Sequence, residues 1–350
     1  FQDSLLRWRC FQAPLRCGKL ALSVKKRPWG CIRLTEMRRR TLLSLGAASV
    51  LAAGGGWKAF SMNSTSSSLL PEQLLQQLKP SPRMPVMFLG HGSPMNVIED
   101  THWRQSWKAL GQELTAKGIA PQLILCVSAH WLTESDWALT GMAQPRTIHD
   151  FGGFPQELFD QQYPAPGAPE VARQLAAELH SPLDGSALLL DQKWGFDHGT
   201  WSVLLPMFPE ASIPVMQLSM PYGLAPEKHF EMGRQLRALR ERGVLIVGSG
   251  NIVHNLRAMQ RGASDNQAYD WTIQFDTEVQ QRLDSGNLVD LSTFLDWGPQ
   301  ARLAHPTHDH YLPLLYAAGA VQEGEVPRVF NTAYQYAALS MRSAIWGLNA

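Results

Sequence analysis

Short apolar runs alternate with longer amphipathic segments from Met84 to the end of the chain. Apolar runs of about four to eight residues are typical of buried strands, whereas apolar residues three and four positions apart are typical of one helix face. On this basis we predict strands at 85–90, 123–128, 213–219 and 244–248. We predict helices at 103–117, 170–179, 227–242, 267–285 and 310–318.

Strands that alternate with helices predict an α/β fold, with a central sheet that is largely parallel or mixed and that helices cover on both faces. No internal repeat is visible, and no stretch after Arg83 is long enough to be a linker between two domains. We therefore interpret residues 84–350 as one catalytic domain. In open α/β sheets ligands bind beyond the carboxyl ends of the strands, so we expect the functional site there.

The first 83 residues differ in character from the rest. Residues 1–36 show no periodicity and contain three of the four cysteines, and we expect them to lie upstream of the natural start. Met37 is followed by three arginines, an apolar stretch that ends at Gly56 and a spacer rich in Ser and Thr. This order is typical of an export signal, and Arg39-Arg40 is similar to the pair in twin-arginine signals.

We therefore predict a twin-arginine-like signal and spacer at 37–68, and a short helix and linker at 69–83. The expected location is the periplasm, or the cytoplasm if the signal is not functional. The apolar stretch is too short and too rich in Gly and Ala for a stable membrane anchor across about 30 Å of hydrocarbon. After cleavage Cys126 would be the one cysteine left, which excludes a disulfide framework and a cysteine-based zinc site.

Composition narrows the class of protein. Hydrophobic residues make up 45% of the chain and the formal net charge is +1, as in a globular protein with a substantial core. The body of the chain has no stripe of Lys and Arg, and the charge near zero gives no electrostatic basis for binding nucleic acid. The sequence leaves the oligomeric state open.

Five histidines lie in short segments flanked by glycine or aromatic residues: His91, His130, His198, His254 and His310. His91 and His130 directly follow predicted strands, and His254 lies in the segment after a third strand. Because the carboxyl ends of parallel strands meet at one edge of a sheet, these histidines can converge. Imidazole is a common ligand of divalent transition metals and the usual acid or base near pH 7. The set therefore predicts a mononuclear metal centre with proton-transfer groups beside it.

Residues next to the histidines refine this prediction. Glycines on both sides of His91 allow the backbone to approach a metal or ligand closely. Asp197 either orients the imidazole of His198 or caps the turn that follows it. His-Glu-x-x-His and Gly-x-Ser-x-Gly motifs are absent, which argues against the common zinc protease and the serine nucleophile elbow.

The segment 147–155 is a second candidate part of the site. It contains His149, Asp150 and Phe154 as candidate substrate-binding residues, together with a glycine pair. We interpret it either as a loop that covers the substrate or as an ordinary turn with a buried aromatic anchor.

Seven segments carry a more specific signal. They are His91-Gly-Ser-Pro-Met-Asn96, Ser128-Ala-His-Trp131, Thr147-Ile-His-Asp-Phe-Gly-Gly-Phe-Pro155, Tyr163-Pro-Ala-Pro-Gly167, Gly195-Phe-Asp-His-Gly199, Gly250-Asn-Ile-Val-His-Asn-Leu256 and His310-Tyr-Leu-Pro-Leu-Leu-Tyr316. In this order they resemble the 4,5-DOPA extradiol dioxygenase family, within the class III extradiol ring-cleavage enzymes. The resemblance covers the chain from Met84 to its C-terminus.

The resemblance implies that O₂ opens the ring of a catechol such as DOPA to give a muconic semialdehyde. It implies one divalent metal per subunit, Fe(II) for dioxygenase activity or Zn(II), at a site made by His91, His130, His198 and His254. Four bound imidazoles would leave too few open positions for the catechol and O₂. We therefore expect His198 or His254 to act as a base toward the catechol hydroxyl, with His310 as the next acid or base.

One departure and two alternatives accompany this interpretation. The family often has Glu before the last histidine, where this chain has Asp309, so a carboxylate role there is an open question. The same histidines around Zn²⁺ with one bound water would suit a zinc-dependent hydrolase. The other alternative is a non-catalytic relative that keeps the fold and binds a metal.

Overall fold

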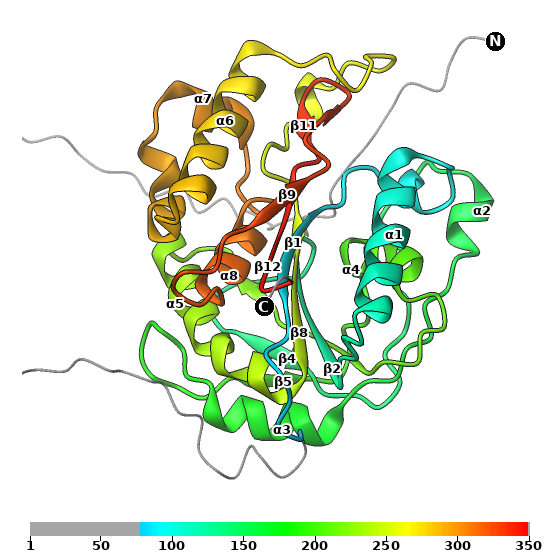
Figure 1. Ribbon diagram of the computed structural model, residues 1–350, viewed down its shortest axis with the longest axis vertical. Coiled ribbons are helices and arrows are strands. Elements are labelled where there is room, and N and C mark those ends of the chain that lie inside the picture. Colours follow the sequence, from blue (N-terminus) through cyan, green and yellow to red (C-terminus); the bar gives the residue numbers. More distant parts are fainter. Residues whose placement is uncertain (1–77, 349–350) are drawn as a thin grey trace, which may run out of the picture. The chain divides into compact units, whose positions relative to one another are not determined.

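The computed structural model describes residues 78–348 (Figure 1). The predicted segments 1–36 and 37–68, and residues 69–77 of the predicted linker, lie outside the described residues.

A mixed sheet lies at the centre, with its six strands in the order β6-β2-β8-β1-β12-β9. Four neighbouring strands are parallel, and two are added antiparallel at one edge. The parallel strands are β1 (Val86–Gly90), β2 (Leu123–Ser128), β6 (Val215–Gln217) and β8 (Val244–Gly250), and the antiparallel ones are β9 (Arg328–Phe330) and β12 (Ser343–Trp346). The prediction of a largely parallel or mixed sheet is confirmed.

The three central strands β1, β2 and β8 are buried at every position. Successive side chains of a strand point to opposite faces, so Val86 and Phe88 enter one core while Met87 and Leu89 enter the other. A strand covered on both faces must be apolar on both, which explains why these segments appear in the sequence as continuous apolar runs.

Helices cover both faces of the sheet (Figure 1). On one face α1 (His102–Ala116) and α4 (His198–Met207) contribute Trp107 and Trp201 to the core. On the other face α5 (Pro226–Leu236) and α8 (Leu312–Gly319) pack against the strands. Each large apolar side chain buried in this way contributes about 1.5–3 kcal/mol to folding.

Further helices and short strands surround this framework. The further helices are α2 (Gln156–Phe159), α3 (Pro169–Glu178), α6 (Asp270–Ser285) and α7 (Pro299–Ala304). Three strand pairs lie outside the main sheet: β3 (Leu132–Thr133) with β7 (Met220–Pro221), β4 (Ala138–Thr140) with β5 (Leu189–Asp191), and β10 (Tyr334–Gln335) with β11 (Leu339–Ser340). The β10–β11 hairpin returns to the carboxyl ends of β1 and β8, where the histidines lie.

The predicted elements agree with the structure where periodicity is strong and differ where it is weak. The predicted helix at 227–242 divides into α5 and a 3-10 helix, Arg237–Arg242, that ends at Gly243 with φ of 72°. The sequence analysis did not predict α4, which begins in the Asp-His-Gly turn and contains Pro206. In the part of the chain that the structure describes, no helix combines the length and apolar character needed to cross a bilayer.

Candidate metal centre

The five motif histidines come together at the carboxyl edge of the parallel strands. His91 directly follows β1, His130 is the second residue after β2, and His254 is the fourth residue after β8. His198 is the first residue of α4, and His310 precedes α8. The expectation that histidines from separate strand ends lie at one edge of the sheet therefore holds in the structure.

Three of these histidines form a group that could hold a metal through imidazole nitrogens alone. One ligand nitrogen from each of His91, His130 and His310 lies within 4.8 Å of the other two. The Nε2 atoms of His91 and His130 are 3.3 Å apart. All three side chains are largely buried, so their nitrogens share one small, sheltered space.

A hydroxyl group fixes the tautomer of His91. The Ser249 hydroxyl lies 2.5 Å from the Gly199 carbonyl and donates its proton to it. His91 Nδ1 is 3.0 Å from the same hydroxyl oxygen, which is left to accept. Nδ1 of His91 therefore carries the proton, and the lone pair of Nε2 is free.

Carboxylates lie beside the Nδ1 atoms of the other two histidines of the group, His130 and His310. His130 Nδ1 lies 3.2 Å from Asp150 Oδ2, and His310 Nδ1 lies 2.5 Å from Asp309 Oδ2. An ionised carboxylate can only accept, so His310 Nδ1 donates to Asp309, and the Asp150 carboxylate favours a proton on His130 Nδ1; the Nε2 lone pair of each ring is then free. Histidines that bind metals are usually held in this manner by an acceptor at the other ring nitrogen.

The remaining two histidines lie against the rings of this group. His198 is tilted over His130 with ring centroids 3.8 Å apart, and its Nδ1 is 2.9 Å from Asp150 Oδ1. The aligned hydrogen bond to that oxygen comes from the His198 backbone N–H, also at 2.9 Å. His254 stacks flat on His310, with centroids 3.4 Å apart and an interplanar angle of 5°. Asp150 thus links His130 to His198.

The surroundings favour the neutral form of His91, His130 and His254. Burial, and then the neighbouring histidines, lower the pKa of His91 well below its usual value. Burial also lowers the pKa of His130 and of His254, with further lowering by His198 and His310 respectively. A neutral imidazole keeps the lone pair that a metal needs, so the site is suited to a cation rather than to a protonated cluster.

The two carboxyl groups are held ionised. Burial favours the neutral form of Asp150, but its interactions with His198 and His130, and the hydrogen bonds from His198, outweigh burial and lower the pKa of Asp150 below the usual range. The pKa of Asp309 is likewise lowered, because His310 outweighs the effect of burial. For His198 burial also opposes the charge, yet the Asp150 carboxylate prevails and raises the pKa of this histidine.

Asp197 resolves one alternative left open by the sequence. Its side chain caps α4 by accepting from the Thr200 backbone N–H at 3.1 Å. The same carboxyl accepts from Ser128 at 2.5 Å and from Gln217 at 2.7 Å. Asp197 therefore fixes the start of the helix, while Asp150 is the carboxylate beside the His198 ring.

The residues of the segment 147–155 differ in whether they contact the histidines of the centre. Asp150 contacts two of the histidines, as described above. His149 Nε2 lies 2.9 Å from the Gln161 carbonyl, and its ring packs in an aromatic cluster with Phe151 and Trp201. Phe154 packs edge-on against Phe151, which in turn meets the His198 ring at 5.5 Å. Of the predicted substrate-binding residues, only Asp150 is in the histidine group.

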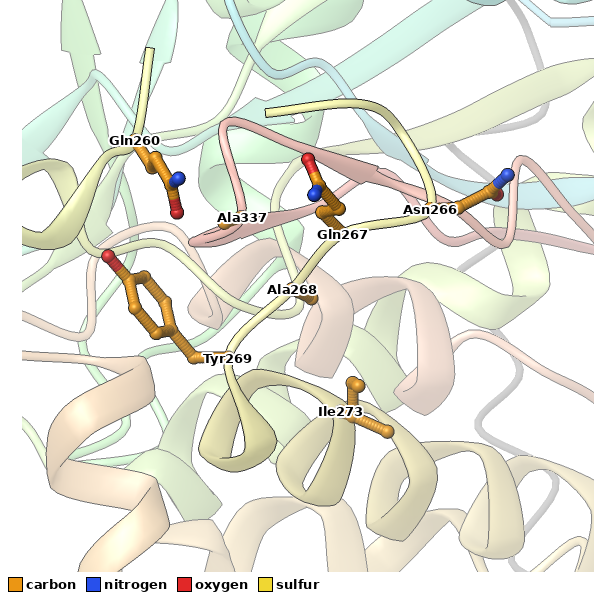
Figure 2. Close-up of a pocket in the computed structure, with 7 residues that line it drawn as sticks. All are labelled: Gln260, Asn266, Gln267, Ala268, Tyr269, Ile273 and Ala337. Atoms are coloured by element: carbon orange, nitrogen blue, oxygen red, sulfur yellow. The ribbon is translucent and has the colours of Figure 1, made fainter. Parts of the chain in front are cut away.

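A separate surface hollow lies near the N-terminus of α6 (Figure 2). Its volume is about 380 Å³, and the side chains of Gln260 and Tyr269 extend toward the same space. The hollow is lined by Gln260, Asn266, Gln267, Ala268, Tyr269, Ile273 and Ala337. None of these is a histidine or an ionised group at neutral pH, so we locate the chemistry at the histidines rather than here.

Comparison with known proteins identifies the class to which this centre belongs. Residues 85–343 match the family described as the catalytic LigB subunit of aromatic ring-opening dioxygenase. The chain therefore belongs to this family, and the resemblance to extradiol dioxygenases is confirmed.

Individual relatives carry more specific names. The chain is 47% identical over 251 residues to a 4,5-DOPA dioxygenase extradiol of Escherichia coli, which covers 71% of this chain and 88% of the relative. It is 34% identical over 260 residues to a protein of the same name from Beta vulgaris, covering 73% and 94%. A crystal structure of an uncharacterized Escherichia coli K12 protein matches with a TM-score of 0.64 and 40% identity, covering 76% of this chain and all of that one.

Proposed function

We propose that this protein is a metal-dependent extradiol dioxygenase that opens the ring of a catechol such as DOPA with O₂ and releases a muconic semialdehyde. The observation that carries the proposal is the set of three imidazoles whose Nδ1 atoms are engaged and whose Nε2 lone pairs are free. The names of the relatives, 4,5-DOPA dioxygenase extradiol, support the choice of substrate class.

His91, His130 and His310 would hold the metal, which differs from the predicted ligand set by placing His310 in it. Three neutral nitrogen donors suit Fe(II) and Zn²⁺ alike and leave positions open for substrate. Fe(II) would supply the electron transfer that lets O₂ react with an aromatic ring, whereas Zn²⁺ supplies Lewis acidity alone. His198 and His254 would remain unbound to the metal.

His198 and His254 would then be the groups that move protons. The Asp150 carboxylate, 2.9 Å from His198 Nδ1, favours the doubly protonated ring, so the Nε2–H of His198 would be the proton donated during ring opening. The ring of His254 stacks on His310 and would accept a proton from the catechol hydroxyl. Both atoms of O₂ enter the product as one carbon–carbon bond next to the diol breaks, and no reductant is consumed.

The 147–155 segment would border the substrate through Phe151, because this ring meets the edge of His198. His149 and Phe154 lie behind it in the aromatic cluster and would support the loop. Asp150 would orient the rings of His130 and His198 instead of contacting the catechol.

The test is to reconstitute the purified protein with Fe(II) without air and then follow O₂ uptake and absorbance with L-DOPA. The proposal predicts stoichiometric O₂ uptake and a yellow semialdehyde, both lost in His130→Ala and retained in His180→Ala, an exposed histidine outside the centre. Tight zinc binding with no O₂ uptake from any catechol would instead favour the zinc-dependent hydrolase. Absence of both O₂ uptake and hydrolysis would leave the non-catalytic metal-binding relative.

We also propose that residues 37–68 export the protein to the periplasm through the twin-arginine route. The support is the order of arginines, apolar stretch and polar spacer in the sequence. Expression of the chain from Met37 with a C-terminal tag should yield a shortened protein in the periplasmic fraction. An uncleaved protein that stays in the cytosol would contradict the export proposal and leave the ring-opening proposal untouched.

A further inference from the structure

Three buried carboxamides connect the segments that carry the metal-binding histidines. They belong to Asn96, Asn251 and Gln335, which come from three distant parts of the chain and are each at most 7% exposed. A buried amide requires partners for both its N–H₂ and its carbonyl group, so its contacts define its position closely.

Asn251 joins the segments that follow β1 and β8 to His310. Its backbone N–H donates to the His310 carbonyl at 2.8 Å, and its Oδ1 accepts from the Gly92 N–H at 3.2 Å. Its Nδ2 donates to the Ser340 carbonyl in β11 at 2.8 Å. The Asn251 side chain therefore joins the neighbour of one proposed ligand to the C-terminal hairpin, while its backbone N–H contacts the backbone of another proposed ligand.

Gln335 in β10 secures the His91 segment from the other side. Its Oε1 accepts from the Ser93 N–H at 2.7 Å, and its Nε2 donates to Asn96 Oδ1 at 2.9 Å. Asn96 Nδ2 in turn donates to the His91 carbonyl at 3.1 Å. The hairpin is thus linked to the backbone of His91 by a chain of two amides.

The backbone segments around these three amides are packed in direct contact with one another. A Cβ atom at Gly250 would lie 2.1 Å from the His310 carbonyl oxygen, and a Cβ atom at Gly90 would lie 2.6 Å from the Met341 carbonyl oxygen. The segments around His91 and His310 are therefore packed at backbone contact, and small changes in the amides would be transmitted to both histidines.

We propose that Asn251 and Gln335 are positioning residues whose side chains hold the His91 segment at the distance from His310 that a metal requires. The inference rests on the proposed metal centre and concerns its construction, because the polar atoms of both amides bond to backbone groups and to Asn96 rather than to imidazole nitrogens. An aspartate at 251 would keep the acceptor for Gly92 but would face the Ser340 carbonyl with an oxygen, which repels it. A glutamate at 335 would lose the donor to Asn96 in the same way.

The test compares Asn251→Asp and Gln335→Glu with Asn287→Asp, a control at an exposed asparagine whose side chain donates to Asp290. Cobalt(II) affinity by chelator competition and the visible spectrum of the bound cobalt report the geometry of the ligands without any need for ring cleavage. We expect both network variants to bind Co(II) roughly 10- to 100-fold more weakly, with an altered spectrum, and the control to match the parent protein.

Several results would overturn the inference. Network variants with the parent affinity and spectrum would show that the amides do not position the ligands. If one of the two network variants fails to fold, the other decides by the same two readouts. A parent protein that binds no Co(II) would reject the proposed metal centre itself, and this inference with it.

Discussion

Asp150 and Asp309 each serve one proposed metal ligand and one further histidine, but the two arrangements are built differently. Asp150 lies 48 residues before His198 and contacts His130 Nδ1, His198 Nδ1 and the His198 backbone. Asp309 is the neighbour of His310 in sequence and holds its Nδ1. The His198 ring lies on the proposed metal ligand His130 and contacts the same carboxylate, Asp150. The His254 ring instead stacks flat on the proposed metal ligand His310.

This difference separates two kinds of proton-transfer group at one centre. The pKa of His198 is raised because the Asp150 carboxylate outweighs burial, and the pKa of His254 is lowered because burial and His310 disfavour its charge. The pKa values of the two histidines thus shift in opposite directions, because Asp150 outweighs burial at His198 whereas Asp309 does not outweigh burial and His310 at His254. The predictions below test this comparison, beginning with the largest expected effect.

Replacing His198 or His254 should impair catalysis without loss of the metal. We expect His198→Gln and His254→Gln to lower kcat by about 10²- to 10⁴-fold, since each removes a proton-transfer group, while metal content stays at the parent level. His310→Ala should lose the metal together with the activity. Metal analysis and O₂ uptake on the same samples check this, and loss of metal from His254→Gln would place that residue among the ligands.

Asp150→Asn should damage more of the centre than Asp309→Asn. The amide at 150 weakens the orientation of both His130 and His198, so we expect metal affinity to fall roughly 10- to 100-fold and kcat to fall as well. Asp309→Asn should affect metal affinity with a smaller change in kcat. Equal changes in both constants for the two variants would remove the distinction between the two sides.

A buried histidine without a carboxylate sharpens the comparison. His229 lies in the core with its Nδ1 2.8 Å from the Tyr316 hydroxyl, and burial, followed by His308, lowers its pKa to about 3. The unfolded chain binds a proton at this histidine more readily than the folded protein does. The free energy of unfolding is therefore unaffected by His229 above about pH 6.5 and decreases as the pH falls toward 3.

Urea unfolding at pH 7 and pH 5 measures this effect. The parent protein should lose about 2 kcal/mol more unfolding free energy over that interval than His229→Gln, which has no proton to gain. The other buried histidines are common to both proteins and cancel in the difference. Equal losses in the two proteins would contradict a neutral, buried His229.

Ser249→Ala should have the smallest effect on the centre. It removes a neutral acceptor from His91 Nδ1, where His130 and His310 have carboxylates. A hydrogen bond to a neutral group contributes about 1 kcal/mol, so we expect metal affinity to fall by less than about 10-fold. Cobalt competition measures it, and a loss as large as that of Asp150→Asn would show that the hydroxyl matters as much as a carboxylate.

The sequence predicted the parts of the fold whose pattern is dictated by burial. Strand β2 occupies the predicted 123–128, and β1, β8 and α1 lie within one or two residues of their predicted bounds. Helix α4 was missed because its first turn contains His198 and Gly199 and its last contains Pro206. The strands β9 and β12 were missed because they are short and their pairing partners are distant in sequence.

The centre was predictable in its residues but not in their grouping. Their positions just after predicted strands identified His91, His130 and His254 from local pattern alone. The nearness of His310 to the first two depends on the path of the chain before α8, which no local pattern encodes. Asn251 and Gln335 gave no signal, because a buried amide is recognised only by the partners that the fold brings to it.

Reaction with isotopically labelled O₂ tests the central claim most directly. The Fe(II)-loaded protein is mixed with L-DOPA under labelled O₂, and the product is analysed by mass spectrometry. The account predicts a ring-opened product with both labelled atoms, formed by the parent protein and His180→Ala but not by His130→Ala. A product that carries no labelled oxygen, or an unchanged catechol from fully loaded protein, would contradict it.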